Sequence, residues 1–187
     1  MITFAACYFF MRIKVSDKHF IRSISAEQIE EKVTGLADQI NRDFRNTNPL
    51  FLSVLNGSFM FTSDLMKKIT INCELQFVKI KSYVGLHSTT KVKTLLAPSQ
   101  EARGRTVIVL EDIVDSGQTL DMLLDQIHPF QPNDIKLCTL LYKPDNFRGK
   151  HAPDYVGFEI PPDFIVGYGL DYNGLGRNLP EIYTITK

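Results

Sequence analysis

The most informative stretch of this 187-residue chain is VIVLEDIVDSGQTL, which spans residues 107–120. It opens with four apolar residues, continues through three acids, and ends in a small polar loop followed by leucine. The apolar run predicts a buried strand over 106–110, and the spacing of apolar residues from about Thr119 predicts a helix. The loop at 115–119 then offers backbone N–H groups, two hydroxyls and a glycine at a helix N-terminus, which suits it to hold a phosphate.

Two of the acids, Glu111 and Asp112, would repel a bare phosphate. They fit a binding site if they face another part of the ligand, such as ribose hydroxyls or a bound Mg²⁺. A solvated loop with a helix cap is the simpler explanation of one Asp-x-x-Asp pattern taken alone. Because the strand, the acidic pair and the loop coincide, we interpret the whole string as a binding site.

Two further helices are expected upstream of this stretch. Ser25 and Gln28 form a capping-box pattern, and the apolar spacing after them predicts a helix that ends near 46–49. A second helix is expected over 58–68, with Phe59 on its inward face.

Short apolar runs predict the strands of a sheet. Strands that alternate with helices indicate an α/β domain with a mostly parallel sheet, in which ligands bind beyond the carboxyl ends of the strands. A long mobile loop is predicted over 84–102, where the residues follow no clear period. Besides the run at 106–110, the predicted strands are 50–55, 75–82, 135–142 and 164–168.

The composition excludes several classes of protein. Lys and Arg number 21 and so do Asp and Glu, so a formal net charge of 0 argues against a strongly basic surface for nucleic acid. Hydrophobic residues make up 44% of the chain and charged residues 22%, which excludes wholesale disorder. No apolar run reaches the ~18–20 residues of a membrane helix, so no membrane partner is expected.

The cysteines and the N-terminal segment bear on where the protein works. Cys7, Cys73 and Cys138 are odd in number and far apart, which argues against a disulfide framework or a zinc cluster and predicts a reducing, cytoplasmic setting. The apolar segment 1–10 lacks the basic start of a signal peptide. If Met11 is an alternative start, residues 1–10 are an upstream extension of one domain that spans 1–187.

The string at 107–120 closely resembles the phosphoribosyl-pyrophosphate (PRPP) motif of type I phosphoribosyltransferases, most of all the hypoxanthine-guanine members. The resemblance extends over about residues 12–187. It implies an α/β core with a small hood built from the N- and C-terminal segments. The implied reaction transfers the 5-phosphoribosyl group of PRPP to hypoxanthine, and to guanine, with Mg²⁺ as cofactor. Its products are IMP or GMP and pyrophosphate. The resemblance also implies a homodimer or homotetramer.

The resemblance assigns roles to the residues of the string. Glu111 and Asp112 correspond to the acids that hold the ribose hydroxyls, directly or through Mg²⁺. Asp115 corresponds to the acid near purine N7, a proposed general base that accepts or shares the proton of the purine as N9 attacks C1′. The 5′-phosphate loop corresponds to Ser116, Gly117, Gln118 and Thr119.

On the pyrophosphate side, the resemblance points to residues from three further segments. Leu55-Asn56-Gly57 corresponds to the pyrophosphate loop, although Asn56 is uncharged where relatives often carry Lys or Arg. Asp171 corresponds to a second acidic site for Mg²⁺, and Arg177 to the arginine that reaches pyrophosphate. Ser82-Tyr83 corresponds to the root of a mobile loop that closes over the site and excludes water.

For the purine pocket, the resemblance points to Lys143, Phe164 and Ile165. An ammonium donor to the purine 6-oxo group selects 6-oxopurines over adenine, whose 6-amino group is itself a donor. Phe164 would stack on the purine, and the carbonyl of Ile165 would meet the substituent at C2. Asp163 stands where many relatives have Lys, which leaves the ranking of hypoxanthine, guanine and xanthine open.

Two alternative functions are compatible with the same motifs. Folds of this type also serve as nucleotide-sensing regulators that bind RNA or DNA, but zero net charge weighs against that function here. A transferase that prefers xanthine or a non-purine base is the other alternative.

Overall fold

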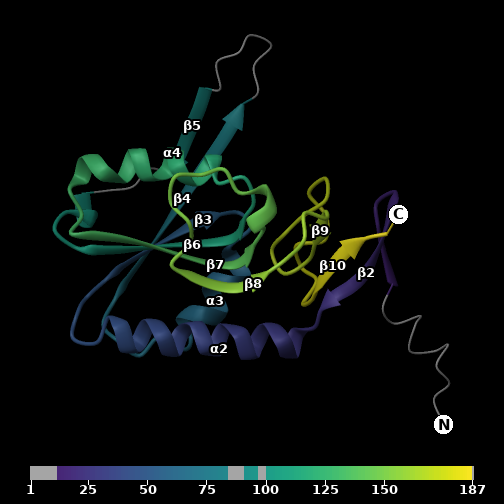
Figure 1. The fold of residues 1–187 in the computed structure, drawn as a ribbon, viewed down its shortest axis with the longest axis horizontal. Coiled ribbons are helices and arrows are strands. Elements are labelled where there is room, and N and C mark those ends of the chain that lie inside the picture. The colour runs from purple at the N-terminus through teal and green to yellow at the C-terminus, as the bar shows by residue number, and fades with distance from the viewer. Residues whose placement is uncertain (1–11, 84–90, 97–99, 187) are drawn as a thin grey trace.

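The computed structural model of the chain describes residues 12–83, 91–96 and 100–186. At its centre lies a sheet of six described strands, in which β4, β3, β6, β7 and β8 run parallel and β5 pairs antiparallel with β4 (Figure 1). This confirms the predicted α/β architecture. In spatial order, the strands are β5 (Lys91–Leu96), β4 (Glu74–Tyr83), β3 (Leu50–Leu55), β6 (Thr106–Val114), β7 (Asp134–Tyr142) and β8 (Tyr155–Glu159).

Helices cover both faces of this sheet. The helices α2 (Ala26–Asp43) and α3 (Phe59–Met66) lie on one face, and α4 (Gln118–Ile127) lies on the other (Figure 1). The predicted capping box is confirmed, because the Ser25 hydroxyl accepts from the backbone N–H of Gln28 and the Gln28 side chain accepts in return. Short 3-10 turns occupy Gln100–Ala102, His128–Phe130 and Pro144–Asn146.

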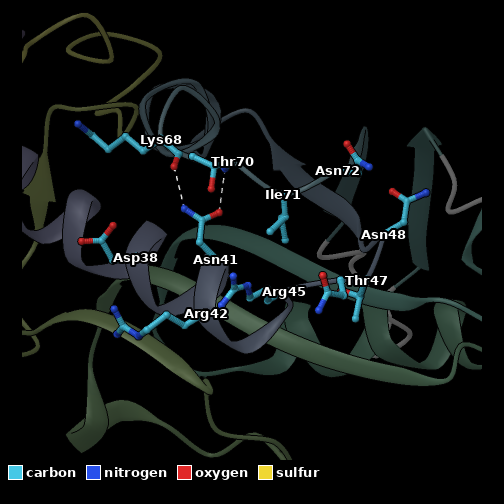
Figure 2. Close-up of a pocket in the computed structure, with 11 residues that line it drawn as sticks. Asp38, Asn41, Arg42, Arg45, Thr47, Asn48, Lys68, Thr70, Ile71 and Asn72 are labelled. Atoms are coloured by element: carbon cyan, nitrogen blue, oxygen red, sulfur yellow. Dashed lines mark hydrogen bonds between the residues drawn. The ribbon is translucent and has the colours of Figure 1, made fainter.

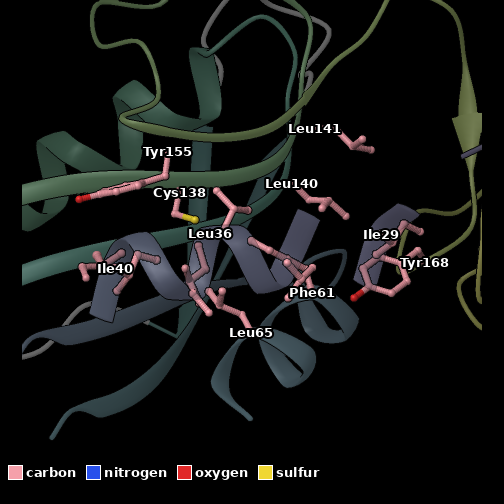
Figure 3. Packing of buried hydrophobic residues seen from close by; sticks show 14 of the residues in the cluster. Ile29, Leu36, Ile40, Phe61, Leu65, Cys138, Leu140, Leu141, Tyr155 and Tyr168 are labelled. Carbon is pink, nitrogen blue, oxygen red and sulfur yellow. The ribbon is translucent and has the colours of Figure 1, made fainter. Parts of the chain in front are cut away.

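The core on the α2 side is a continuous layer of apolar side chains. Ile40 of α2 and Phe61 of α3 pack against the sheet, where Cys138 and Leu140 are also buried (Figure 3). Burial of this apolar area is the main stabilising contribution to such a fold, at ~25 cal/mol per Å² removed from water. It fixes the strands whose carboxyl ends carry the site.

A second, smaller sheet joins the two ends of the chain. Its antiparallel strands are ordered β1-β2-β10-β9, so segments more than 150 residues apart in the sequence lie side by side (Figure 1). The Tyr168 hydroxyl donates to Asp64 of α3 at 2.7 Å and ties this hood to the large sheet's helices. The predicted hood is therefore confirmed. Its strands are β1 (Arg12–Val15), β2 (Lys18–Ile24), β9 (Ile165–Val166) and β10 (Ile182–Ile185).

Several predicted elements need correction. Phe59 is 42% exposed, and Phe61 takes the inward position in its place. The predicted loop over 84–102 contains the strand β5 and the 3-10 turn Gln100–Ala102, and its parts at 84–90 and 97–99 lie outside the described residues. The predicted strand 164–168 is reduced to two residues, because positive φ values at Gly167, Tyr168 and Gly169 end it. It pairs within the hood and not within the large sheet.

Three further observations concern the end of α2, the character of the helices and the N-terminal segment. The helix α2 ends at Asp43, a few residues before the predicted 46–49. Within the described residues, no helix has the length and apolar character needed to cross a membrane. The predicted upstream extension at 1–10 lies outside the described residues.

Candidate active site

The predicted phosphate loop forms the junction between β6 and α4. Gly117 is the residue that caps α4, with φ of +81°, and as a glycine it has no side chain to cover the first-turn N–H groups. The Ser116 hydroxyl accepts from one of them, the Gln118 N–H, at 3.5 Å. The helix N-terminus therefore presents its amide donors to the cavity beside it. That cavity has a volume of about 110 Å³ and is lined by Glu111, Ile113, Val114, Asp115, Ser116, Gly117, Thr119 and Leu120.

Asp115 lies at the centre of a small polar cluster. Lys143 Nζ donates to Asp115 Oδ2 at 2.8 Å, and Asn146 Nδ2 donates to Oδ1 at 2.9 Å. Partial burial opposes ionisation of Asp115, but these two hydrogen bonds and the Lys143 charge outweigh it, so its pKa is lowered. Lys143 is itself 6% exposed, and its backbone N–H donates to Val114 at 3.0 Å. An ionised acceptor and a buried cationic donor therefore stand side by side.

Glu111 and Asp112 lie within β6, because the strand continues to Val114 beyond the predicted end at 110. Burial, together with the charge of Asp112 and a hydrogen bond to it, raises the pKa of Glu111 well above its usual range. Burial raises the pKa of Asp112 to about 6, and backbone hydrogen bonds from Ile113 and Asp112, with the Arg177 charge, only partly offset this. The environment of this pair disfavours negative charge in the absence of a ligand, as expected where a cation or hydroxyl donors will bind.

Asp112→Asn should therefore stabilise the protein in the absence of ligands. The ordinary pKa of this carboxyl is 3.8, so the folded state binds more protons than the unfolded state between pH 4 and 6, and stability falls across that window as pH rises. We expect the variant to raise the free energy of unfolding by about 1–2 kcal/mol at pH 7.5, allowing for residual solvent screening of Asp112. The gain should shrink at pH 4.5. Urea denaturation at both pH values tests this, and a loss of stability at pH 7.5 would contradict it.

The turn after β3 meets the C-terminal segment. A cis Leu55–Asn56 peptide bond leads into Gly57, where an added Cβ would lie 1.6 Å from Asp112 Oδ2. At Gly169, with φ of +100°, an added Cβ would lie 1.9 Å from the Gly57 carbonyl oxygen. Only glycine permits these two close approaches, which bring the predicted pyrophosphate loop against the acidic pair and the hood.

The anchor of this turn is a network of buried hydroxyls. Ser53 Oγ lies 2.7 Å from both Ser58 Oγ and Thr62 Oγ1, and Ser58 Oγ donates to the Val54 carbonyl at 2.5 Å. The network holds the start of α3 against β3, so the loop between them has a fixed position.

Arg177 and Asp171 form an ion pair on the hood side of the site. Arg177 Nη1 also donates to the Gly169 carbonyl at 2.6 Å, and Asp171 accepts from the Gly174 N–H at 2.7 Å. Since Gly169 contacts Gly57, both predicted residues belong to the same cluster as the acidic pair.

The predicted purine-stacking residue is available for contact. Phe164 is 45% exposed, and its ring packs edge-on against Tyr172 at 5.7 Å and tilted against Phe20 at 6.4 Å. Ile165 is buried in β9. Ser82-Tyr83 ends β4 as predicted, and the loop predicted to follow it lies largely outside the described residues.

Comparison with known proteins decides the family. The family model of the phosphoribosyl transferase domain matches residues 24–173. This chain belongs to the phosphoribosyl transferase family.

Individual relatives carry more specific names. A hypoxanthine-guanine phosphoribosyltransferase of Streptococcus pyogenes is 40% identical over 159 residues, which cover 84% of this chain and 88% of the relative. A crystal structure of a hypoxanthine-guanine phosphoribosyltransferase from Bacillus anthracis superposes with a TM-score of 0.82 at 41% identity, covering 93% of this chain and all of that one. A bifunctional TilS/HprT protein of Listeria monocytogenes is 40% identical over 160 residues. These residues are 85% of this chain but span only a quarter of that relative's length.

A wider pocket of this phosphoribosyltransferase lies away from the site. It has a volume of about 880 Å³ and is formed between the end of α2 and the segment at 68–72 (Figure 2). The Asn41 side chain donates to the Lys68 carbonyl at 2.9 Å and accepts from the Thr70 N–H at 2.8 Å. These lining residues precede β3 and β4, whereas ligands of parallel sheets bind beyond the carboxyl ends of strands. The candidate active site is therefore the one at the predicted phosphate loop.

Three contributors to the site were not predicted from the sequence. Asn146 holds Asp115, and Gly169 allows the hood to reach Gly57. Phe147 packs against the loop, since a Cβ added at Gly117 would lie 2.5 Å from its Cε2. The spacing of Gly167 and Gly169 around Tyr168 was a usable signal for a close approach of backbone, whereas nothing in the sequence marks Asn146.

Proposed function

We propose that this chain transfers the 5-phosphoribosyl group of PRPP to N9 of a 6-oxopurine, hypoxanthine or guanine, as a step in purine salvage. The observation that carries this proposal is the pairing of Asp115 with Lys143 at the mouth of the phosphate loop. A 6-oxopurine presents an N–H donor at N7 beside an acceptor at O6, which complements a carboxylate beside an ammonium. The 6-amino group of adenine would face the ammonium as a second donor.

The reaction breaks the bond between C1′ and the pyrophosphate oxygen and forms the bond between C1′ and N9. Positive charge develops on the ribose ring in a loose transition state, so catalysis comes mainly from positioning and from neutralising the leaving pyrophosphate. With its lowered pKa, Asp115 is ionised at neutral pH and accepts the purine N7 proton as the bond between C1′ and N9 forms. The amides of the 115–119 loop hold the 5′-phosphate, and Arg177 reaches the pyrophosphate.

The acids of the site suit Mg²⁺ as the cofactor. Carboxylate oxygens are the ligands that Mg²⁺ prefers, and it commonly takes one or two of them together with substrate oxygens and water. Glu111 and Asp112 would hold one ion, and their raised pKa values fit a place meant for a cation. Asp171 would belong to a second site on the pyrophosphate side, since no three acids of the described residues converge on one point. When bound, Mg²⁺ would neutralise the charge that develops on pyrophosphate.

Gly117→Ala should weaken PRPP binding by disturbing the phosphate loop. The alanine Cβ would meet Phe147 at 2.5 Å in a left-handed backbone, where L residues are disfavoured by about 1–2 kcal/mol. We expect the KM for PRPP to rise at least about tenfold, the equivalent of losing ~1.4 kcal/mol of binding. Gly35→Ala in α2 is the matched control, since its Cβ meets nothing within 4 Å. An unchanged KM in Gly117→Ala would contradict the assignment of this loop.

Self-association and location complete the proposal. Leu75 and Phe77 lie two residues apart on β4, hence on one face, and are 36% and 41% exposed, which supports a homodimer or homotetramer. Light scattering at micromolar concentration tests this, and a monomer would contradict it. Cys73 and Cys138 are free thiols, in keeping with a reducing cytoplasm.

The decisive test of specificity is an assay with PRPP, Mg²⁺ and each of four bases in turn. We expect turnover with hypoxanthine or guanine, none with adenine, and none without Mg²⁺. PRPP binding without turnover on hypoxanthine, guanine or xanthine would contradict the proposal that this chain is a transferase. It would favour a nucleotide-sensing regulator. Turnover on xanthine alone would support phosphoribosyl transfer but contradict hypoxanthine and guanine as the acceptor bases.

A further inference from the structure

We propose that Lys79, on β4, supplies the positive charge that binds the pyrophosphate group of PRPP beside the Leu55-Asn56-Gly57 loop. The inference rests on the proposed function. It names a binding residue that lies outside the loop and that the sequence motifs did not indicate.

Strand register places Lys79 at the loop. Its Cα is the partner of Leu55 in the parallel pairing of β3 with β4. Leu55 is the last residue of β3, and ligands of such a sheet bind beyond the carboxyl ends of its strands. Lys79 Nζ donates to Asn56 Oδ1 at 2.8 Å. Asn56 is exposed and Lys79 half-buried, so the stem of the lysine is supported while its ammonium stands at the surface of the loop.

The ammonium of Lys79 differs from the other two site cations in its partner. Lys143 is paired with Asp115, and Arg177 with Asp171, so each faces a carboxylate. The hydrogen-bond partner of Lys79 is a neutral amide, and no carboxylate within the described residues forms an ion pair with it. An ammonium has three donors, so two remain for phosphate oxygens after the bond to Asn56.

The charges of the neighbouring side chains favour a direct cation at this place. Lys143 and Arg177 are each already paired with a carboxylate, Asp115 and Asp171. The pyrophosphate of PRPP adds further negative charge, and Asn56 brings none to offset it. Gly57 joins this loop to Asp112 and Gly169, so a group bound there lies beside Lys79 and on the same side as Arg177.

This arrangement predicts a difference between ligands. PRPP and inorganic pyrophosphate would contact Lys79, whereas IMP carries only the 5′-phosphate, which the 115–119 loop binds. Loss of the Lys79 charge should therefore weaken the binding of PRPP and pyrophosphate and leave the binding of IMP nearly unchanged.

The test is calorimetric titration of Lys79→Met with pyrophosphate, PRPP and IMP in the presence of Mg²⁺. We expect Kd for pyrophosphate and PRPP to rise at least about tenfold, as for the loss of one charge-assisted contact, and Kd for IMP to change less than about twofold. Lys79→Arg should keep most of the affinity. Adding Asn56→Lys to Lys79→Met should restore it, since the charge returns within the loop. Lys32→Met, on the exposed side of α2, controls for the loss of one positive charge.

Three outcomes would overturn the role of Lys79. The first is wild-type affinity for pyrophosphate and PRPP in Lys79→Met. The second is an equal loss of affinity for IMP in Lys79→Met, which would indicate a general disturbance of the site. The third is an equal loss in Asn56→Ala, which keeps the ammonium and would indicate that Lys79 only orients Asn56. Failure of the proposed function appears separately, as absence of IMP formation by the wild-type protein whatever Lys79 does.

Discussion

Asn in place of Asp115 is expected to lower kcat with hypoxanthine by about 10²–10³-fold, the range in which positioned proton-transfer groups act. The substitution removes the ionised acceptor for the purine N7 proton and places an amide beside Lys143, which leaves that buried ammonium without a carboxylate. The amides that hold the 5′-phosphate belong to the backbone and stay in place. The KM for PRPP should therefore change less than about threefold, so the loss lies in turnover.

Steady-state kinetics with both substrates varied separate the two parameters. Asp145→Asn is the matched control, because this neighbouring acid is exposed and lies one residue before Asn146. Turnover of Asp115→Asn near the wild-type value would show that Asp115 has no part in handling the proton.

Ala in place of Lys143 is expected to lower kcat/KM for hypoxanthine by about 10²-fold, which corresponds to ~2.7 kcal/mol of lost transition-state binding. Lys143 is almost fully buried, so its charge-assisted hydrogen bond to O6 would form in an environment that strengthens it. The variant should also discriminate less against adenine, because the donor that opposes the 6-amino group is gone.

The same variant has a second, independent readout. Lys143 is one of the groups that lower the pKa of Asp115, so its removal should raise that pKa. Asp115 must be ionised to accept the purine proton, and the acidic limb of the pH profile of kcat/KM should therefore move to higher pH.

Lys136→Ala controls for loss of a lysine from the same part of the fold. Lys136 lies near the start of β7, where it pairs with Asp134 and Asp154, at the opposite end from Lys143. Unchanged hypoxanthine kinetics in Lys143→Ala would contradict the assignment of the purine pocket to Lys143.

The large sheet could be predicted well because a pattern of a few consecutive residues indicates each of its parallel strands. The run at 106–110 is apolar on both faces, as parallel central strands are, and the spacing from Thr119 has a helical period. The phosphate loop follows directly from this junction. For the same reason, the acidic pair and Asp115 could be assigned to the site from their positions along the chain alone.

The hood strands could not be predicted in this way. The strand β2 alternates polar and apolar residues only loosely, and its partner β10 lies some 160 residues away, so neither carries a strong local pattern. The hood was expected only from resemblance to a family. Its contacts with the core, such as Tyr168 with Asp64, depend on three-dimensional packing.

Residues that reach the site through contacts between distant segments were also out of reach. Asn146 and Lys79 matter because of what lies beside them, Asp115 and Asn56, which are separated from them by 31 and 23 positions. The misassigned Phe59 has a related cause. The apolar residues of α3 lie on more than one face, so their spacing does not distinguish Phe59 from the buried Phe61.

The most direct test of phosphoribosyl transfer is the product balance of one reaction. The wild-type protein is incubated with PRPP, hypoxanthine and Mg²⁺, and IMP and pyrophosphate are quantified together by chromatography and phosphorus NMR. We expect both products to appear in a 1:1 ratio and no ribose 5-phosphate to accumulate. PRPP that stays intact, or that is consumed to ribose 5-phosphate without IMP, would contradict phosphoribosyl transfer to the purine.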